Sequence, residues 1–314
     1  YTGGQVRRML SFLFRNPDGN LRSGWRIAVM CLLAVAVIAL VNVAWRGLGL
    51  PGMQSGGPWW FLLFATLVSG GILAVVLASL RVMEGLGPAA IFLPFDRSAI
   101  RMTLIGMLLG AAPIVCIVLA ALLGGYGTLV STRLAVAELG MTLMPMLCAG
   151  FLLAAWEEVV LRGYLLRQLS LGINALAAAL ITGVVFGLLH AGNPGANWEG
   201  LVYTAVGGVL MAWLVLRSGS LWLLVGYHFG WNAVSSEVFG LQLSGFDRGA
   251  SLLSVTLDGP DWLTGGDYGF EASFPTLLAE VVVLAIALRV SAIRRPRPGG
   301  RRHQGLVQDK ALVP

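Results

Sequence analysis

Charged residues are scarce in this sequence. Only 11% of its 314 residues are Asp, Glu, Lys or Arg, whereas a soluble domain usually contains about 25%. Apolar residues make up 57% and occur in runs of roughly 18–24 residues, long enough to cross about 30 Å of hydrocarbon. The sequence therefore predicts an all-α polytopic membrane protein rather than a soluble one. The high pI does not indicate a nucleic-acid partner, because the arginines lie between the apolar runs and at the chain ends.

Cysteine is also rare, which argues against a disulfide framework. The three cysteines, Cys31, Cys116 and Cys148, all lie inside apolar runs and form no CxxC pair. We therefore expect them to be small buried hydrophobic residues.

The apolar runs predict about eight membrane spans in one bundle. They cover residues 27–45, 59–80, 102–123, 139–169, 173–190, 200–216, 221–239 and 274–291. The predicted organisation is an N-terminal segment at 1–26, a helical bundle at 27–293 with its functional core at about 139–240, and a basic tail at 294–314. Because the tail is rich in proline and arginine, it is expected to be disordered.

Arginine placement predicts the orientation of these spans. Five arginines precede the first span, and more lie in the loop 81–101 and in the tail 294–314, whereas the loop 240–272 is acidic and glycine-rich. Positive charge accumulates on the cytoplasmic side of membrane proteins. We therefore expect a multi-pass protein of the cell membrane, of the bacterial inner membrane type, with both termini in the cytoplasm.

Two adjacent glutamates and an arginine interrupt the fourth predicted span. Residues 139–156 carry no charge, but Glu157, Glu158 and Arg162 follow. Each such charge costs about 2.5–3.5 kcal/mol near the centre of a bilayer, so three of them require an explanation. Glu158 and Arg162 are four residues apart and can form an ion pair on one helix face. Glu157 points about 100° away and is left as a free carboxylate that is suited to general-base catalysis.

A tight turn after this span predicts which residues oppose Glu157. If the turn occupies residues 170–172, the fifth span runs back along the fourth as an antiparallel helix. Reflecting Glu157 about residue 171 then places Phe186 and His190 within about one helical turn of it.

The seventh span carries a second polar pair, His228 and Asn232, which lie on one helix face because they are four residues apart. Together with Glu157 and His190, these side chains suit hydrolysis. Glu157 and one histidine can activate water, while the other histidine and Asn232 donate hydrogen bonds to an oxyanion. Alternatively, the two histidines and Glu157 can hold a divalent metal such as zinc and its bound water.

Each of these residues also has a purely structural interpretation. A histidine or asparagine in a membrane helix is often an interhelical hydrogen-bonding residue, Glu158 and Arg162 can be a clamp, and Phe186 can be packing. We assign four other glutamates near span ends to the membrane interfaces: Glu138, Glu199, Glu237 and Glu280. The feature that favours a functional site is the convergence of five polar groups at matched depths on three spans.

At these residues the sequence resembles a known family. The motifs Glu157-Glu158-x-x-x-Arg162, Phe186-x-x-x-His190 and His228-x-x-x-Asn232, in this order, are similar to those of the CPBP intramembrane proteases. This family contains CAAX prenyl protease 2 and the bacteriocin-processing enzymes, and is also called Abi. The resemblance implies an eight-helix bundle, with a cavity open to the cytosol, that cleaves peptide bonds in membrane-associated or lipidated substrates.

The resemblance also implies roles for the individual residues. Glu157 and His190 would activate the water, His228 and Asn232 would stabilise the oxyanion, and Glu158 and Arg162 would support them. Members of the family are often described as metalloproteases, but this sequence has no HExxH motif, so both the metal-dependent and the metal-free mechanism stay open. The implied partners are a peptide or membrane-protein substrate and the lipid bilayer, with no nucleic acid.

Two other functional classes compete with this interpretation. Buried Glu, Arg and His also mark ion pathways in proton-coupled transporters. Such carriers usually have two repeated halves with broken helices, whereas the polar residues here lie in the fourth, fifth and seventh spans. The second class is a non-catalytic immunity or scaffold protein that retains the motif residues without turnover.

Overall fold

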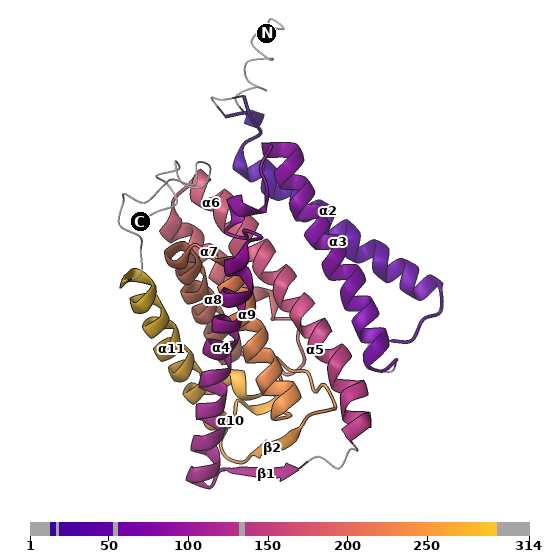
Figure 1. Cartoon of the computed structure of the whole chain (residues 1–314), viewed down its shortest axis with the longest axis vertical. Helices are drawn as coiled ribbons and strands as arrows, with labels where there is room; N and C mark the ends of the chain where they lie inside the picture. The colour runs from indigo at the N-terminus through magenta and orange to yellow at the C-terminus, as the bar shows by residue number, and fades with distance from the viewer. Residues whose placement is uncertain (1–12, 17–18, 53–55, 132–135, 294–314) are drawn as a thin grey trace, which may run out of the picture.

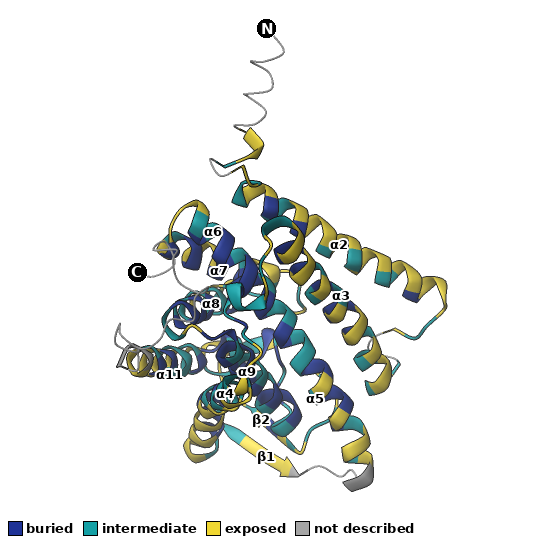
Figure 2. Cartoon of the chain, turned by 45° about the horizontal axis from the view of Figure 1, so that its top comes forward, coloured by how far each residue is buried: buried dark blue, intermediate teal, exposed yellow. Residues whose placement is uncertain are grey.

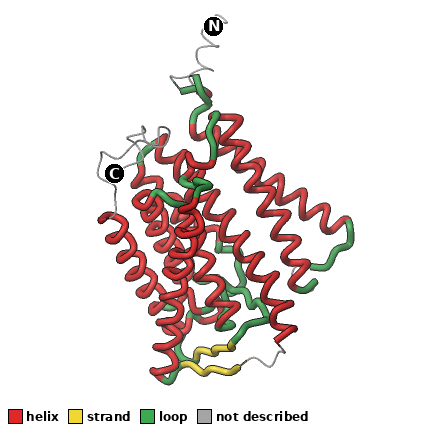
Figure 3. Tube along the Cα trace, viewed as in Figure 1, coloured by secondary structure: helices red, strands yellow, loops and turns green. Residues whose placement is uncertain are grey.

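The computed structural model describes residues 13–16, 19–52, 56–131 and 136–293, and these form a bundle of helices (Figures 1 and 3). The N-terminal and C-terminal segments predicted at 1–26 and 294–314 therefore lie partly and wholly outside the described residues. Each predicted span coincides with a helical segment. The helices are α2 (Ser23–Gly47), α3 (Pro58–Glu84), α4 (Arg97–Gly124), α5 (Val136–Glu158), α6 (Leu166–Gly172), α7 (Ala175–Leu189), α8 (Trp198–Ser218), α9 (Leu221–Asn232), α10 (Asp261–Thr264) and α11 (Phe274–Ile293).

The all-α membrane class is confirmed, whereas the exact number of spans stays a prediction. Within the described part of the chain, five helical segments are long and apolar enough to cross a membrane: Ser23–Gly47, Pro58–Glu84, Arg97–Gly124, Glu138–Gly172 and Trp198–Ser218. The helix α7 is apolar but has only 15 residues. Helix α9 has 12 residues and continues as the π-helical segment η3 (Ala233–Val238).

Local sequence signals explain where several helices begin and end. The side chain of Asn174 accepts a hydrogen bond from Ala177 N at the start of α7, and Asn197 caps α8 in the same way through Gly200 N. Gly85, Gly125 and Gly219 end α3, α4 and α8 in the left-handed conformation that glycine adopts without steric cost. The turn between α6 and α7 therefore lies at Ile173 and Asn174, two residues later than the sequence predicted.

Glycine contacts hold the central helices unusually close. A Cβ atom at Gly106 or Gly110 of α4 would lie 2.1 or 2.0 Å from a backbone oxygen of α9, and Gly226 and Gly230 of α9 face α4 in the same way. Gly183 and Gly187 of α7 likewise have no room for a side chain against α8. Small residues allow this approach in lipid, where burial of apolar surface does not drive helices together. These contacts place α9 and α7 firmly against their neighbours.

The outer surface of the bundle is apolar, and several charged side chains are inside. In Figure 2 the helix α2 is largely exposed, while buried residues concentrate around α8 and α9. The three cysteines are free and exposed on these apolar helices, so the expectation that they are buried is wrong. The reason is that a membrane protein can present small apolar side chains to lipid as readily as to its interior.

A short antiparallel sheet covers one end of the bundle. The strand β1 (Gly127–Ser131) pairs with β2 (Leu253–Leu257), with Leu129 opposite Val255 (Figure 1). Two one-turn helices, η4 (Gly266–Tyr268) and η5 (Phe270–Ala272), follow β2 in the chain. A third, η1 (Pro88–Ile91), lies between α3 and α4. The predicted loop 240–272 is therefore largely structured. The start of α2 and the end of α11 lie at the opposite end (Figure 1).

Candidate active site

The fourth predicted span is not a regular helix. After Glu158 the chain continues as the π-helical segment η2 (Val159–Leu165) before α6 begins. A π-helix pairs residues five apart, is rare, and occurs frequently at functional sites. Gly163 lies within this segment, where a Cβ atom would meet Leu221 and Ile91 at 3.2 and 3.3 Å. The widened turn thus packs closely on its neighbours, a feature that regular helical periodicity did not reveal.

The predicted ion pair between Glu158 and Arg162 is present and fully buried. Arg162 Nη1 donates to Glu158 Oε1 at 3.1 Å, and neither side chain is exposed. The guanidinium also lies 4.1 Å from the ring centre of Phe186, which is cation–π geometry. Arg162 Nε and Nη2 and Glu158 Oε2 have no hydrogen-bond partner among the described residues. The pair neutralises two charges but leaves buried polar atoms unsatisfied, as several other buried side chains of the described structure also do.

His228 connects this pair to the second glutamate. Its Nδ1 lies 2.9 Å from Glu158 Oε1, and its Nε2 lies 3.9 Å from Glu157 Oε2. A carboxylate oxygen accepts hydrogen bonds, so each ring nitrogen of His228 faces an acceptor. Both ring nitrogens of His228 are therefore placed to donate a hydrogen bond. The close packing of α4 on α9 fixes the position of this histidine.

His190 has a different hydrogen-bonding arrangement. It follows the last residue of α7, and its Nδ1 lies 2.8 Å from the backbone oxygen of Phe186. Because a carbonyl oxygen only accepts, Nδ1 must carry the hydrogen, and the neutral ring has its lone pair on Nε2. The two histidines thus differ in the group that each can offer to a substrate: an acceptor from His190 and a donor from His228.

Phe186 lies between the two histidines. Its ring makes edge contacts with His190 and His228, with centroid distances of 4.8 and 6.0 Å, while Arg162 covers its face. The interpretation of Phe186 as a packing residue is compatible with this geometry. The side chains that it packs against, however, belong to three predicted site residues.

Glu157 is the accessible member of the cluster. Its side chain is 26% exposed, compared with 12% for His228 and none for Glu158. The 3.9 Å separation from His228 Nε2 is too long for a direct hydrogen bond. It allows one water molecule to contact both groups at about 2.8 Å. A carboxylate and an imidazole placed in this way can hold and polarise a nucleophilic water.

Direct contacts therefore join four of the six predicted site residues, and His190 is linked to them through the ring of Phe186. Asn232 lies one turn beyond His228 on α9 and is half-buried. Within the described residues its side chain makes no hydrogen bond, and only its backbone oxygen accepts one, from Ser236 Oγ. Its amide is thus available on the His228 side of the helix.

Glu280 is a residue that the sequence prediction missed. It was assigned to a membrane interface, but its carboxylate reaches the cluster from the middle of α11. A Cβ atom at Gly207 would lie 2.3 Å from Glu280 Oε1, and one at the adjacent Gly208 would lie 2.9 Å from Arg162 Nη2. Glu280 and Arg162 thus lie against adjacent glycines of α8. A glutamate inside the apolar span 274–291 was the signal that could have identified it.

Glu237, which the sequence places near the end of a span, lies near the end of η3. It is buried in η3, where it accepts from Arg248 Nη1 at 3.1 Å and from Ser236 Oγ at 2.8 Å. This ion pair fastens the segment after α9 to the chain near β2. In the same region Tyr268 is buried, and burial raises its pKa to about 12.

The alternative of a zinc ion held by two histidines and Glu157 does not fit the structure. Among the described residues, no three His, Cys, Asp or Glu side chains are arranged to hold a metal ion. The hydrogen bonds at Nδ1 of His228 and His190 leave Nε2 of each ring for a metal, so it is the arrangement of the side chains, and not these hydrogen bonds, that argues against zinc. The described side chains thus form no three-ligand zinc site.

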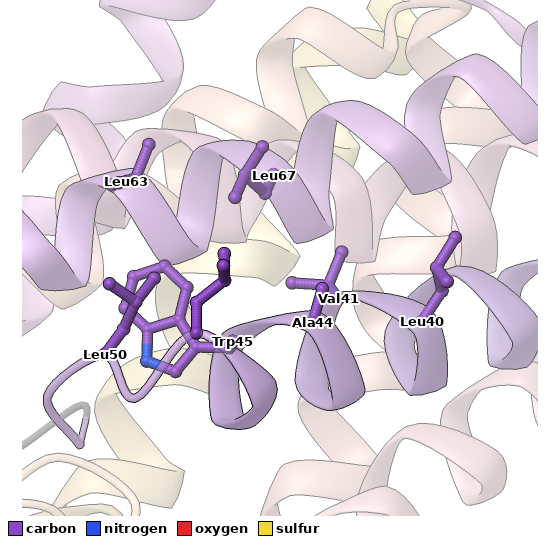
Figure 4. Close-up of a pocket in the computed structure, with 8 residues that line it drawn as sticks. Leu40, Val41, Ala44, Trp45, Leu50, Leu63 and Leu67 are labelled. Carbon is purple, nitrogen blue, oxygen red and sulfur yellow. The ribbon is translucent and has the colours of Figure 1, made fainter.

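A cavity of about 340 Å³ lies elsewhere, between α2 and α3 (Figure 4). Its lining is wholly apolar and includes Leu40, Trp45 and Leu67. None of the cluster residues lines it, so it is not the site of the chemistry. An apolar surface groove of this kind is expected where lipid chains contact a bundle.

Comparison with known proteins agrees with the geometry. Residues 139–234 match the family described as type II CAAX prenyl endopeptidase, Rce1-like. This part of the chain is therefore similar to the Rce1-like family. The match confirms the resemblance to the CPBP family, and the Rce1-like region contains all six predicted site residues.

One relative and the solved structures complete the comparison. The uncharacterized protein YyaK of Bacillus subtilis (strain 168) is 33% identical over 137 residues. The alignment covers 42% of this chain and 42% of YyaK, so it spans less than half of that relative. No solved structure matches the chain.

Proposed function

We propose that this protein is an intramembrane endopeptidase that hydrolyses a peptide bond in a membrane-associated or lipidated substrate. The observation that carries the proposal is the 3.9 Å approach of Glu157, an accessible carboxylate, to His228, whose other nitrogen contacts a buried ion pair. The Rce1-like match over residues 139–234 supports the same reaction class. No transport function is needed to explain these buried charges.

In the proposed mechanism Glu157 is the general base, and His190 Nε2 helps to hold the attacking water. The water oxygen bonds to the carbonyl carbon of the substrate, and Glu157 receives the water proton. His228 Nε2–H and the amide of Asn232 donate to the resulting oxyanion. The C–N bond then breaks, and the proton moves from Glu157 to the leaving nitrogen. Glu158 and Arg162 position His228.

We also propose a cell-membrane location of the bacterial inner membrane type, with both chain ends in the cytoplasm and a catalytic core at residues 139–240. The start of α2 and the end of α11 lie at the same end of the bundle, which supports this orientation (Figure 1). Labelling of single cysteines in intact cells tests it. A cysteine at Ser98, near the start of α4, should be protected from a membrane-impermeant maleimide, and one at Thr256 in β2 should react.

The decisive experiment measures cleavage by the full chain in lipid nanodiscs. The probes are a quenched peptide ending in a farnesylated Cys-Ala-Ala-Met sequence and its unprenylated counterpart. Glu157→Gln should lower kcat by about 10²–10⁴, because general-base catalysis contributes that much. Glu138→Gln is the matched control, since Glu138 lies on the same helix about 28 Å away and should retain activity.

Three results would contradict the proposal. Equal hydrolysis by wild type and Glu157→Gln would exclude Glu157 as the base. Absence of hydrolysis of both peptides and of a panel of single-span membrane proteins would favour the scaffold interpretation. Uptake of an ion into proteoliposomes that Glu157→Gln abolishes would favour the transporter interpretation. Preference for the farnesylated peptide would identify a lipidated substrate.

A further inference from the structure

Glu271 lies outside the Rce1-like region, yet its carboxylate joins separate parts of the fold. It belongs to η5, and its Oε1 accepts from Trp231 Nε1 at 2.9 Å. Its Oε2 accepts from the backbone N and the Oγ of Ser244, at 2.6 and 2.5 Å. Trp231 immediately precedes Asn232 on α9. Oε1 of Glu271 thus bonds to the helix that carries His228, and Oε2 bonds to the turn at Ser244.

Ser244 continues this connection to the other histidine. Its backbone oxygen accepts from Asn193 Nδ2 at 3.0 Å, and the backbone N of Asn193 donates to His190 O at 3.1 Å. Ser244 has a φ of 47°, which is uncommon for a residue other than glycine and needs support from surrounding contacts. A Cβ atom at the next residue, Gly245, would lie 2.0 Å from Pro194 O. The turn is therefore seated directly on the segment that follows His190.

The helices that carry the two histidines have different main neighbours. Helix α7 packs chiefly on α8, whereas α9 packs chiefly on α4. The position of His190 relative to His228 therefore depends on how α7 and α9 pack on other helices. The ring of Phe186 provides the direct contact between the two histidines. The chain of hydrogen bonds from Trp231 through Glu271 and Ser244 to Asn193 supplies a second connection, at the end of α7.

We propose that Glu271 is a positioning residue that fixes the spacing between His190 and His228. The inference rests on the proposed function, because the spacing matters only if both histidines act on one substrate. Displacement of a catalytic group by about 1 Å can lower a rate by about 10²-fold. Loss of the connection should therefore lower turnover more than it weakens substrate binding.

A purely structural role for Glu271 would have a different signature. The pair of Glu237 and Arg248 provides the comparison, because it also links the end of the α9 region to the following loop. No hydrogen bond of either residue reaches the segment after His190 within the described structure. If Glu271 only anchored the loop, loss of either link would have the same consequences.

The test compares Trp231→Phe, Asn193→Ala and Glu271→Gln with Arg248→Gln, in nanodiscs, with the farnesylated peptide. The first three variants should lower kcat about tenfold or more and change KM by less than about twofold. Arg248→Gln should lower the melting temperature and leave kcat within about twofold. The double variant Trp231→Phe/Asn193→Ala should be no slower than its slower parent, because both changes break one connection.

Hydrogen–deuterium exchange of the peptide containing residues 188–196 gives an independent readout that needs no activity. Trp231→Phe, on another helix, should accelerate exchange there at least about fivefold, while Arg248→Gln should not. Wild-type exchange in folded Trp231→Phe and Glu271→Gln would overturn the inference, as would kcat values within twofold of wild type. If wild type cleaves no peptide, the proposed function fails, and the exchange measurement still decides whether Glu271 holds the His190 segment.

Discussion

Two of the buried clusters of carboxylate and arginine in the described structure differ in how completely their carboxylates are hydrogen-bonded. In the first, Glu84 accepts from Arg26 and Arg167 at 2.7 Å each and from Gln168 at 2.6 Å. These contacts tie α3 to α2 and α6. In the second, Arg162 has one hydrogen-bonded nitrogen and Glu157 has no direct hydrogen bond among the described residues. In the first cluster the carboxylate of Glu84 is hydrogen-bonded through both oxygens. In the second cluster the carboxylate of Glu157 is available to bind water or substrate.

This difference separates a structural use of buried charge from a chemical one. A carboxylate that accepts three charge-assisted or amide hydrogen bonds is held in one geometry and has little capacity for a substrate. A carboxylate that faces an imidazole across the width of a water molecule can take up a proton from that water. Composition alone cannot distinguish the two clusters, because both combine Glu and Arg in apolar helices.

The largest expected effect on stability comes from Glu84→Gln. It removes the anion from two buried arginines, and breaking one buried pair already costs about 3–5 kcal/mol. Glu157→Gln should leave the free energy of unfolding unchanged within about 0.5 kcal/mol, because its carboxylate is partly exposed and has no close partner. Thermal unfolding in nanodiscs measures both. Equal destabilisation by the two variants would remove the distinction between the clusters.

The next prediction compares an arginine from each cluster. Arg162→Leu leaves the buried Glu158 with His228 as its remaining donor and should cost about 3–5 kcal/mol. Arg167→Leu should cost less, about 1.5–3 kcal/mol, because Glu84 keeps Arg26 and Gln168 as donors. Both are measured as changes in unfolding free energy. A larger loss from Arg167→Leu would show that the Glu84 cluster depends on both arginines together.

A smaller effect is expected from the glycines that position α9. Gly110→Ala should destabilise the protein by about 1–3 kcal/mol and lower activity, because its Cβ would lie 2.0 Å from Tyr227 O and force α4 away from α9. Gly70→Ala is the control. Its Cβ meets nothing within 4 Å, so alanine should be neutral or stabilising by about 0.5–1 kcal/mol. Equal behaviour of the two variants would contradict the close contact.

The smallest effect is expected from metal removal. Exhaustive dialysis against a chelator should leave peptide cleavage within about twofold of the untreated enzyme, because no three His, Cys, Asp or Glu side chains of the described residues are arranged to hold a metal ion. Re-addition of zinc serves as the control for recovery. Loss of activity that zinc restores would require the histidine side chains to rearrange around a metal.

Sequence patterns predicted much of this arrangement. The positions of the helices and the pairing of Glu158 with Arg162 follow from hydropathy and helical periodicity, which act over a few residues. A shift of the turn to Ile173 and Asn174 moves the reflected partner of Glu157 to His190 itself. Helix α7, however, contacts α6 and η2 and packs chiefly on α8 rather than along α5, so the antiparallel pairing is present only near the turn.

Other features lay beyond these patterns. In the Glu84 cluster, the side chains that bond to Glu84 are 58 to 84 positions away from it in the sequence. Glu280 approaches the site from α11, the last described helix. Contacts of this kind depend on how helices pack and not on the spacing of residues within one helix. The π-helical turn after Glu158 was missed for a related reason, since its sequence is compatible with a regular helix and its shape depends on surrounding packing.

The amino-acid sequence by itself determined that this is a helical membrane protein and which polar residues interrupt its apolar runs, because each such residue has a cost that local hydropathy reveals. Only the tertiary structure decided the use of each charge. Whether a buried carboxylate is saturated like Glu84 or left accessible like Glu157 depends on donors brought from distant helices, and their number is a property of the packed bundle.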